Sequence, residues 1–193
     1  MTYLSPAKIN LFLHVTSKRP DGYHNLQTIF QLLDYCDEIS LDYREDGIIN
    51  RLSGNESIPQ DQDLAIRSAT ILKKMTGSKG GVDIGIAKKI PMGGGLGGGS
   101  SNAATVLIAL NKLWSLNLSK EKLMHIGQNL GADVPVFVNC HSSWGEGIGE
   151  ILTPITLPKY FYLIVSIDKH ISTKEIFTHK ALTMSPVQRK IAD

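Results

Sequence analysis

The residues best suited to chemistry lie in a glycine-rich stretch at positions 91–104. The stretch reads Pro-Met-Gly-Gly-Gly-Leu-Gly-Gly-Gly-Ser-Ser-Asn-Ala-Ala. Glycine carries no side chain and reaches positive φ at little cost, so successive N–H groups can turn inward and form an anion-binding nest. The segment at 103–114 is rich in alanine and leucine and is expected to be helical. The loop therefore leads into a helix N-terminus, where unpaired N–H groups and the helix dipole favour phosphate.

Two familiar glycine motifs do not account for this stretch. Gly93, Gly95 and Gly98 satisfy G-x-G-x-x-G, but that match is nearly automatic in a run of glycines. The dinucleotide-binding unit also needs an acidic residue about 20 residues later, and a second helix follows here instead. A phosphate loop with lysine before Ser/Thr is excluded because Gly99 precedes Ser100. A flexible linker is disfavoured because the stretch joins an apolar strand to an apolar helix.

Alternating apolar residues predict the strands that position this loop. The expected strands are 5–16, 26–33, 38–43, 48–52 and 82–90, followed by an apolar strand at 160–167. A turn at 18–22 joins the first two, and Asp46-Gly47 is expected to form a hairpin turn into 48–52. Lys8 and Asn10 fall on one face of the first strand, where they could simply be solvated.

Capping residues predict where the helices begin and end. Asp63 is expected to cap a helix over 64–75, with Gly77 as the residue that terminates it. Ser119 is expected to cap a second helix, which ends near residue 130. Ser172 or Thr173 is expected to cap a helix that runs through 177. Because helices and strands do not alternate strictly, the sequence predicts an α+β fold rather than a doubly wound parallel sheet.

Composition excludes several classes of protein. The net charge is +2 over 193 residues, with 42% hydrophobic and 20% charged residues, which does not suggest a nucleic-acid-binding surface. Cys36 and Cys140 form no C-x-x-C pair and cannot make a zinc site, so we expect free thiols in a reducing cytoplasm. No dedicated metal-ligand cluster is expected. No apolar run reaches the ~18 residues of a membrane span, and no membrane partner is expected.

Four segments in this order resemble the GHMP small-molecule kinases. Ser5-Pro-Ala-Lys-Ile-Asn10 is similar to the first motif of that family, and Pro91–Ala104 is similar to the second. Arg19-Pro-Asp-Gly-Tyr-His24 and Leu130-Gly-Ala-Asp-Val-Pro-Val-Phe137 resemble segments of the branch that acts on a cytidyl-bearing methylerythritol. The resemblance implies phosphorylation of an alcohol by ATP with Mg²⁺, in non-mevalonate isoprenoid biosynthesis.

The resemblance also implies a fold and its division into domains. Residues 1–150 would form the GHMP kinase N-terminal ATP-binding domain, which is similar to a ribosomal-protein fold. Residues 151–193 would begin the C-terminal substrate-side domain. The family carries a third glycine-rich motif, similar to Gly-Thr-Gly-Ala, that nothing here matches. We therefore expect a C-terminally truncated kinase that self-associates through residues after 151.

Two residues match the catalytic positions of the family. Asp133 is the candidate general base for the substrate hydroxyl, and Lys8 would lie beside it and favour the carboxylate. The alternative for Asp133 is an ordinary helix cap ahead of Val134-Pro135.

The nucleotide site implied by the resemblance is larger. It comprises Lys88, Pro91, Met92, Gly93, Gly94, Gly95, Leu96, Gly97, Gly98, Gly99, Ser100 and Ser101, with Asp63 and Leu64 beside the adenine. The two serines are expected to reach phosphate or Mg²⁺. Lys89 adjoins Lys88, and the sequence leaves open which of them meets ATP. Asp63 stands where the family has asparagine, which removes an amide donor.

The substrate site implied by the resemblance lies at the other end of the first strand. It comprises Asn10, Tyr23, His24 and Phe177, with aromatic rings stacking on the cytosine. The alternative for Phe177 is a core residue of its own helix.

Three classes of function therefore remain for comparison. The first is a small-molecule kinase, and the second is an inactive or weakly active nucleotide-binding fragment of one. The third is an RNA-binding or structural protein, which the near-neutral charge disfavours.

Overall fold

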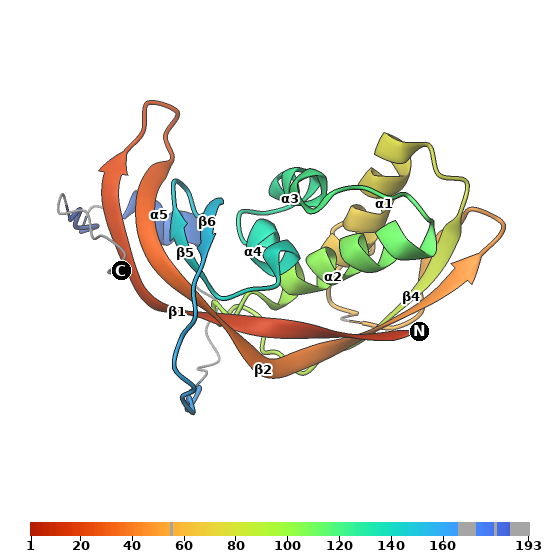
Figure 1. The fold of residues 1–193 in the computed structure, drawn as a ribbon, viewed down its shortest axis with the longest axis horizontal. Coiled ribbons are helices and arrows are strands. Elements are labelled where there is room, and N and C mark those ends of the chain that lie inside the picture. Colours follow the sequence, from red (N-terminus) through yellow and green to blue (C-terminus); the bar gives the residue numbers. More distant parts are fainter. Residues whose placement is uncertain (55, 166–172, 180, 186–193) are drawn as a thin grey trace.

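A six-stranded sheet forms the frame of the molecule. The computed structural model describes residues 1–54, 56–165, 173–179 and 181–185. The strands are β1 (Thr2–Lys18), β2 (His24–Arg44), β3 (Ile49–Arg51), β4 (Gly81–Ala87), β5 (Ser143–Glu146) and β6 (Ile151–Pro154). Their order is β3-β4-β2-β5-β6, and β1 pairs with β2 (Figure 1). The sheet is antiparallel except for the parallel pair of β3 and β4.

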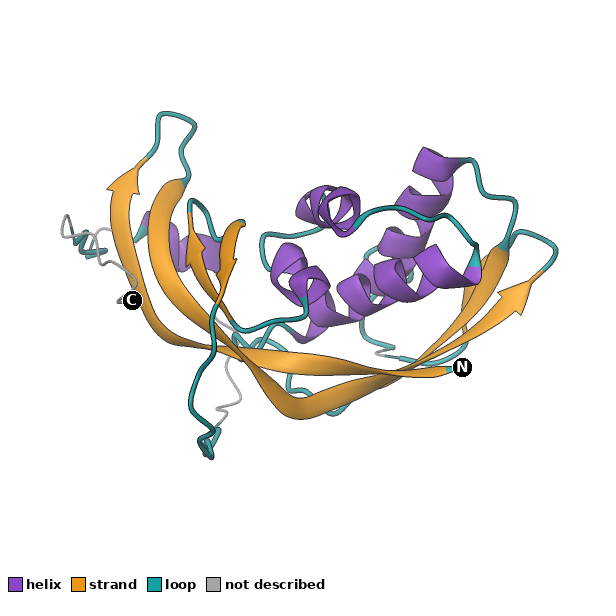
Figure 2. Cartoon of the chain, viewed as in Figure 1, coloured by secondary structure: helices purple, strands orange, loops and turns teal. Residues whose placement is uncertain are grey.

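Four helices cover one face of this sheet (Figure 2). They are α1 (Leu64–Thr76), α2 (Gly98–Leu113), α3 (Lys120–Gln128) and α4 (Val134–Asn139). A further short helix, α5 (Thr173–Thr178), contacts the start of β2, where Phe177 stacks on His24. The apolar side chains of α1 and α2 and of strands β2 and β4 form the main core, which includes Leu72, Ile84 and Leu107. The arrangement confirms the predicted α+β class.

The two predicted strands at 26–33 and 38–43 are in fact one long strand, β2. Polar and exposed residues at 34 and 35 interrupt the apolar pattern, but the backbone continues to pair with β1 on both sides of them, as Cys36 with Pro6 and Leu32 with Lys8. One half of β2 then pairs with β4 and the other half with β5. A single strand thus connects the helix-covered part of the sheet to the β5–β6 hairpin.

The strand β1 does not keep the regular alternation that its sequence suggests. Its register against β2 shifts between Pro6 and Lys8 and again between Asn10 and Leu13. Ala7 and Lys8 are consequently both buried, whereas Leu11 and Leu13 are exposed. Irregular pairing of this kind redirects side chains relative to a regular strand.

The expected hairpin at Asp46-Gly47 does not form. The chain turns there, with Gly47 at φ 74°, but β3 pairs in parallel with β4 instead of folding back on β2. Parallel neighbours need a crossover connection, and α1 supplies it, capped by Asp63 and ended by Gly77 at φ 70° as predicted.

The helix after the glycine stretch begins earlier than expected. α2 starts at Gly98 rather than near residue 103, and the N–H of Ser101 donates to the Gly97 carbonyl at 2.8 Å. Glycine is a poor helix former, so packing determines this start: Gly98 is buried against Ile90.

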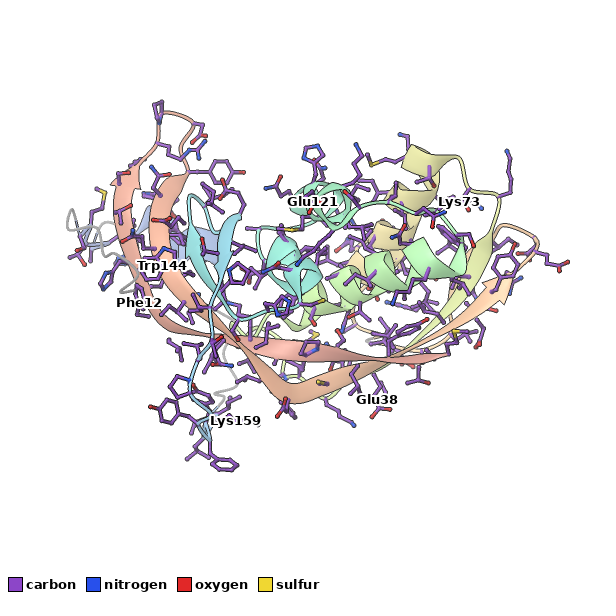
Figure 3. The ribbon with its side chains drawn as sticks, viewed as in Figure 1. Phe12, Glu38, Lys73, Glu121, Trp144 and Lys159 are labelled. Carbon is purple, nitrogen blue, oxygen red and sulfur yellow. The ribbon has the colours of Figure 1, made fainter. Side chains whose placement is uncertain are left out.

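The segment after β6 differs from its prediction. Residues 160–165, expected to be a strand, have no regular structure, and residues 166 and 167 lie outside the described part, as does Ser172. Lys159 lies near the end of a loop that projects away from the sheet (Figure 3). The sequence did not predict the strands β5 and β6. The turn between them contains the expected domain boundary at residue 150, and that boundary stays a prediction.

Within the described residues, no helix combines the length and apolar character that a bilayer crossing requires.

The cap of α1 gives a test of the fold. Asp63 accepts from the N–H of Ala65 and from Arg51, both at 2.9 Å. We expect Asp63→Ala to lower the free energy of unfolding by about 2–4 kcal/mol, because it removes the cap and leaves the buried Arg51 unpaired. Urea unfolding measures this loss. Ser119→Ala, at the exposed cap of α3, is the control and should cost about 1 kcal/mol or less; an equal loss in the two variants would contradict the role of the Arg51 pair.

Candidate active site

The glycine stretch forms an open loop between β4 and α2. Gly93, Gly95 and Gly97 have φ of 73°, 71° and 71°, so every second residue adopts the left-handed conformation. This alternation turns successive N–H groups toward one side and is typical of an anion-binding nest. Met92 and the three glycines after it are exposed and Pro91 is half-buried, whereas Leu96 is buried against Ala7 and Ile90.

The loop is attached directly to β1. The N–H of Lys8 donates to the Leu96 carbonyl at 3.0 Å. One residue later, a Cβ on Gly97 would lie 2.8 Å from the Phe137 ring and 3.3 Å from Lys8 Cγ. Glycine at 97 therefore permits a close approach between the loop, β1 and α4.

The Lys8 side chain is buried and not solvated. Its Nζ donates to Asn10 Oδ1 at 2.6 Å, lies 3.4 Å from Asp133 Oδ2, and lies 5.6 Å from the centre of the Phe30 ring. The Asn10 amide in turn donates to Thr28 Oγ1 at 2.7 Å. The first strand thus brings Lys8 and Asn10 together with Asp133, which is far away in sequence.

Asp133 precedes α4 but does not cap it. The residue occupies the N-cap position, yet its carboxylate makes no capping hydrogen bond. The carboxylate faces Lys8 instead and remains 37% exposed. The alternative of an ordinary helix cap is therefore not observed, and the carboxylate is open to a substrate hydroxyl.

The two serines at the start of α2 differ in their surroundings. The Ser101 hydroxyl is fully buried and accepts from Ser5 Oγ at 2.9 Å, so it points into the interior. The sequence had led us to expect this hydroxyl at the loop surface, within reach of phosphate or Mg²⁺. Ser100 is only half-buried. The Ser100 hydroxyl lies beside the segment that precedes α4, since a Cβ on Gly131 would be 3.6 Å from Ser100 Oγ. The described residues contain no cluster of three His, Cys, Asp or Glu side chains able to hold a metal.

The structure separates Lys88 from Lys89. Lys89 forms a surface ion pair with Glu38 at 2.6 Å. Lys88 instead pairs with the fully buried Asp37 and lies beside Gly98, at the start of α2. Sequence reasoning missed Asp37, because it falls between the two apolar runs at 26–33 and 38–43 and was therefore assigned to neither strand.

Asp63 and Leu64 lie at the start of α1, beside the first turn of α2. Both carboxylate oxygens of Asp63 have partners within the protein, in the cap and in the ion pair with Arg51. Leu64 approaches α2, because a Cβ on Gly99 would lie 3.6 Å from Leu64 Cδ1.

Of the predicted substrate residues, Tyr23, His24 and Phe177 lie at the end of the β1–β2 hairpin, whereas Asn10 lies beside Lys8. The rings of His24 and Phe177 stack with centroids 5.6 Å apart and an interplanar angle of 29°. Phe177 is half-buried on α5, and Tyr23 next to the turn is 61% exposed. The structure therefore brings Phe177 from the far end of the chain to the hairpin, and leaves the Tyr23 ring accessible.

The comparisons agree with this geometry. The chain matches the family model of the GHMP kinases N terminal domain over residues 63–141. A solved mevalonate kinase, 15% identical, superposes with a TM-score of 0.60 over 81% of this chain and 56% of that one, which shows the shared fold. The fold and the glycine loop thus define a small-molecule kinase of the GHMP class.

More similar relatives narrow the class. The 4-diphosphocytidyl-2-C-methyl-D-erythritol kinase of Ruthia magnifica subsp. Calyptogena magnifica is 60% identical over 191 residues, which are 99% of this chain and 67% of that relative. That of Cupriavidus metallidurans is 50% identical over 98% of this chain and 65% of its own length. A solved 4-(cytidine 5'-diphospho)-2C-methyl-D-erythritol kinase, 39% identical, gives a TM-score of 0.72 over 82% of this chain and 56% of that chain. The chain belongs to the 4-diphosphocytidyl-2-C-methyl-D-erythritol kinase family, and it spans about two thirds of the length of these curated relatives.

The glycine loop can be tested by two matched substitutions. Gly97→Ala would place a Cβ against Phe137 at positive φ, so we expect a loss of about 1–3 kcal/mol in the free energy of unfolding. Gly99→Ala would place a Cβ at an ordinary contact distance of 3.6 Å from Leu64 Cδ1, on a helical backbone, so we expect stability to be unchanged or to rise by up to about 1 kcal/mol. Thermal unfolding measures both, and equal effects would show that the Phe137 contact does not constrain the loop.

Proposed function

We propose that this chain carries the ATP-binding and catalytic residues of a kinase that phosphorylates the 2-hydroxyl of 4-diphosphocytidyl-2-C-methyl-D-erythritol, a reaction of non-mevalonate isoprenoid biosynthesis. The observation that carries the proposal is the pair of Lys8 and Asp133 directly beside the glycine loop. A buried ammonium, an accessible carboxylate and a row of loop N–H groups are what transfer of a phosphoryl group to an alcohol needs.

In the proposed phosphoryl transfer, Asp133, Lys8 and Asn10 each have a separate role. The substrate hydroxyl gives its proton to the Asp133 carboxylate while its oxygen forms a bond to the γ-phosphorus of ATP. The bond between that phosphorus and the bridging oxygen breaks, and ADP leaves. Lys8, 3.4 Å from Asp133, stabilises the negative charge that develops on the attacking oxygen. Asn10 holds the ammonium in place by accepting from it at 2.6 Å.

The nucleotide would bind along the glycine loop. The alternating left-handed glycines and the N-terminus of α2 supply N–H donors for the phosphates. Mg²⁺, which would accompany ATP and neutralise phosphate charge, would find the Ser100 hydroxyl nearby. The adenine would lie toward Leu64, and the cytidyl group toward Tyr23, His24 and Phe177. We place the reaction in the cytoplasm, where the thiols of Cys36 and Cys140 stay reduced.

The experiment is a phosphoryl-transfer assay run beside binding measurements. Asp133→Asn keeps the shape of the side chain but removes the base, so we expect ATP binding to be unchanged and turnover to fall by about 10²–10⁴. Lys8→Met should lower turnover similarly. Glu38→Gln, at an exposed ion pair, is the control and should leave turnover unchanged. Full turnover by folded Asp133→Asn would remove Asp133 from the mechanism.

A second candidate is a nucleotide-binding fragment with little or no turnover. The observation that favours it is that the relatives extend well beyond the length matched here. A misplacement of about 1 Å in the substrate costs ~10²-fold in rate, so an incomplete substrate lobe is enough to silence intact catalytic groups. ATP binding without phosphoryl transfer by the 193-residue chain would establish this candidate.

We further propose that two copies of this chain associate through residues 160–165. Phe161 is 107% and Leu163 is 92% exposed in this apolar segment, and in the described part of the chain β6 pairs only with β5. Exposed apolar side chains and an unpaired strand edge each favour association with another chain. We expect dimers or larger species by light scattering. Phe161→Asp with Leu163→Asp should give monomers, whereas Leu52→Asp, at an exposed site on the far part of the sheet, should not. A monomeric unsubstituted chain would contradict the proposal.

A further inference from the structure

A buried carboxylate joins the two ends of the glycine stretch. Asp37 of β2 is fully buried and accepts hydrogen bonds from the N–H groups of Lys89 and Ile90 at 2.7 and 2.9 Å. It also accepts from the Asn102 amide at 2.9 Å and from Lys88 Nζ. Residues 88–90 precede the loop and Asn102 follows it in α2, so one side chain holds both ends of the loop together.

The same network reaches β1. The Asn102 amide donates to Ser5 Oγ at 3.0 Å, and Ser5 donates to Ser101 at 2.9 Å. A chain of hydrogen bonds thus runs from β2 through α2 to the start of the strand that carries Lys8. None of these groups belongs to the proposed catalytic pair.

The Lys88 ammonium lies at the open side of this network. Two of its contacts are to Asp37 and to Asn102 Oδ1, the latter at 3.2 Å. A Cβ on Gly98 would lie 3.1 Å from Lys88 Nζ, which places the ammonium over the first residue of α2. An ammonium has three N–H donors, and within the described residues these two oxygens are the only hydrogen-bond acceptors that Lys88 has. The third donor is available to an anion at the helix N-terminus.

The charge of Asp37 is maintained despite its burial. Burial raises the pKa of the Asp37 carboxyl. The hydrogen bonds from Lys88, from the two backbone N–H groups and from Asn102 together lower that pKa by more, so it lies below the ordinary value. The ionised carboxylate therefore keeps the ammonium of Lys88 in one place.

From this geometry we infer that Asp37 is a positioning residue for nucleotide binding, which holds the Lys88 ammonium over the start of α2, where it meets a phosphate of ATP. The inference rests on the proposed function, since it assumes that the loop binds a nucleotide. A purely structural role for Asp37 would instead affect the fold, and its loss would weaken the binding of ATP and of adenosine equally.

The test compares ATP with adenosine, because only ATP carries the phosphates. Dissociation constants are measured by calorimetry, at a temperature where thermal unfolding shows each variant folded. We expect Asp37→Asn to weaken ATP binding about tenfold or more and to leave adenosine binding unchanged, because a charge-assisted contact is misplaced. Lys88→Met should give the same selective loss. The double variant should bind ATP no more weakly than Lys88→Met alone, because Asp37 acts through Lys88.

The matched control is Asp83→Asn on β4. Asp83 accepts from Asn50 and Arg44 in the same sheet, away from the loop. It should lower stability without changing the ratio of ATP to adenosine affinity. If Asp37→Asn does not fold, Asp37→Glu replaces it, since that change keeps the buried charge but moves the carboxylate and with it the Lys88 ammonium; a selective loss of ATP affinity supports the inference, and unchanged affinity overturns it.

The remaining outcomes are distinct. Folded Asp37→Asn with normal ATP affinity, or with equal losses for ATP and adenosine, overturns the inference and leaves the proposed function standing. An unsubstituted chain that binds neither ligand overturns the proposed function, and the inference with it.

Discussion

The burial of the Lys8 ammonium is the constraint on which the site depends. A buried cation is costly unless it is paired and hydrogen-bonded, so its partners cannot be optional. Asn10, Asp133 and the face of Phe30 supply them. The shift in register beside Pro6 brings Lys8 inward, and its N–H anchors the glycine loop at Leu96. Strand β1, the glycine loop and the Asp133 carboxylate are therefore held together around one charge.

The continuous strand β2 allows the two ends of the site to act on one frame. One half of β2 pairs with β4, which leads into the glycine loop, and the other half pairs with β5. At its N-terminal end, His24 stacks on Phe177, while Asp37, further along, holds the loop. A break between 33 and 38, as the apolar pattern suggested, would have left these two ends on separate elements.

Local signals in the sequence predicted what depends on local physics. The cap at Asp63, the left-handed Gly77 and the left-handed glycines of the loop follow from residue type and neighbours. The burial of Lys8 and the roles of Asp37 and Ser101 do not, because each depends on partners more than 25 residues away in sequence. The pairing of β3 with β4 was missed for the same reason. The catalytic role of Asp133 comes from the resemblance to the kinases and stays a prediction, since residue type alone would have left Asp133 as a helix cap.

Two lysine–carboxylate pairs flank the loop, and their exposures are opposite. In the pair of Lys8 and Asp133, the lysine side chain is 7% exposed and the carboxylate 37%. In the pair of Lys88 and Asp37, the lysine is 22% exposed and the carboxylate is fully buried. The more exposed member of each pair is the one that a ligand reaches more easily, and it is a carboxylate in the first pair and an ammonium in the second. An open carboxylate suits acceptance of a proton, and an open ammonium suits a phosphate, so the two pairs present the opposite charges that the proposed phosphoryl transfer uses.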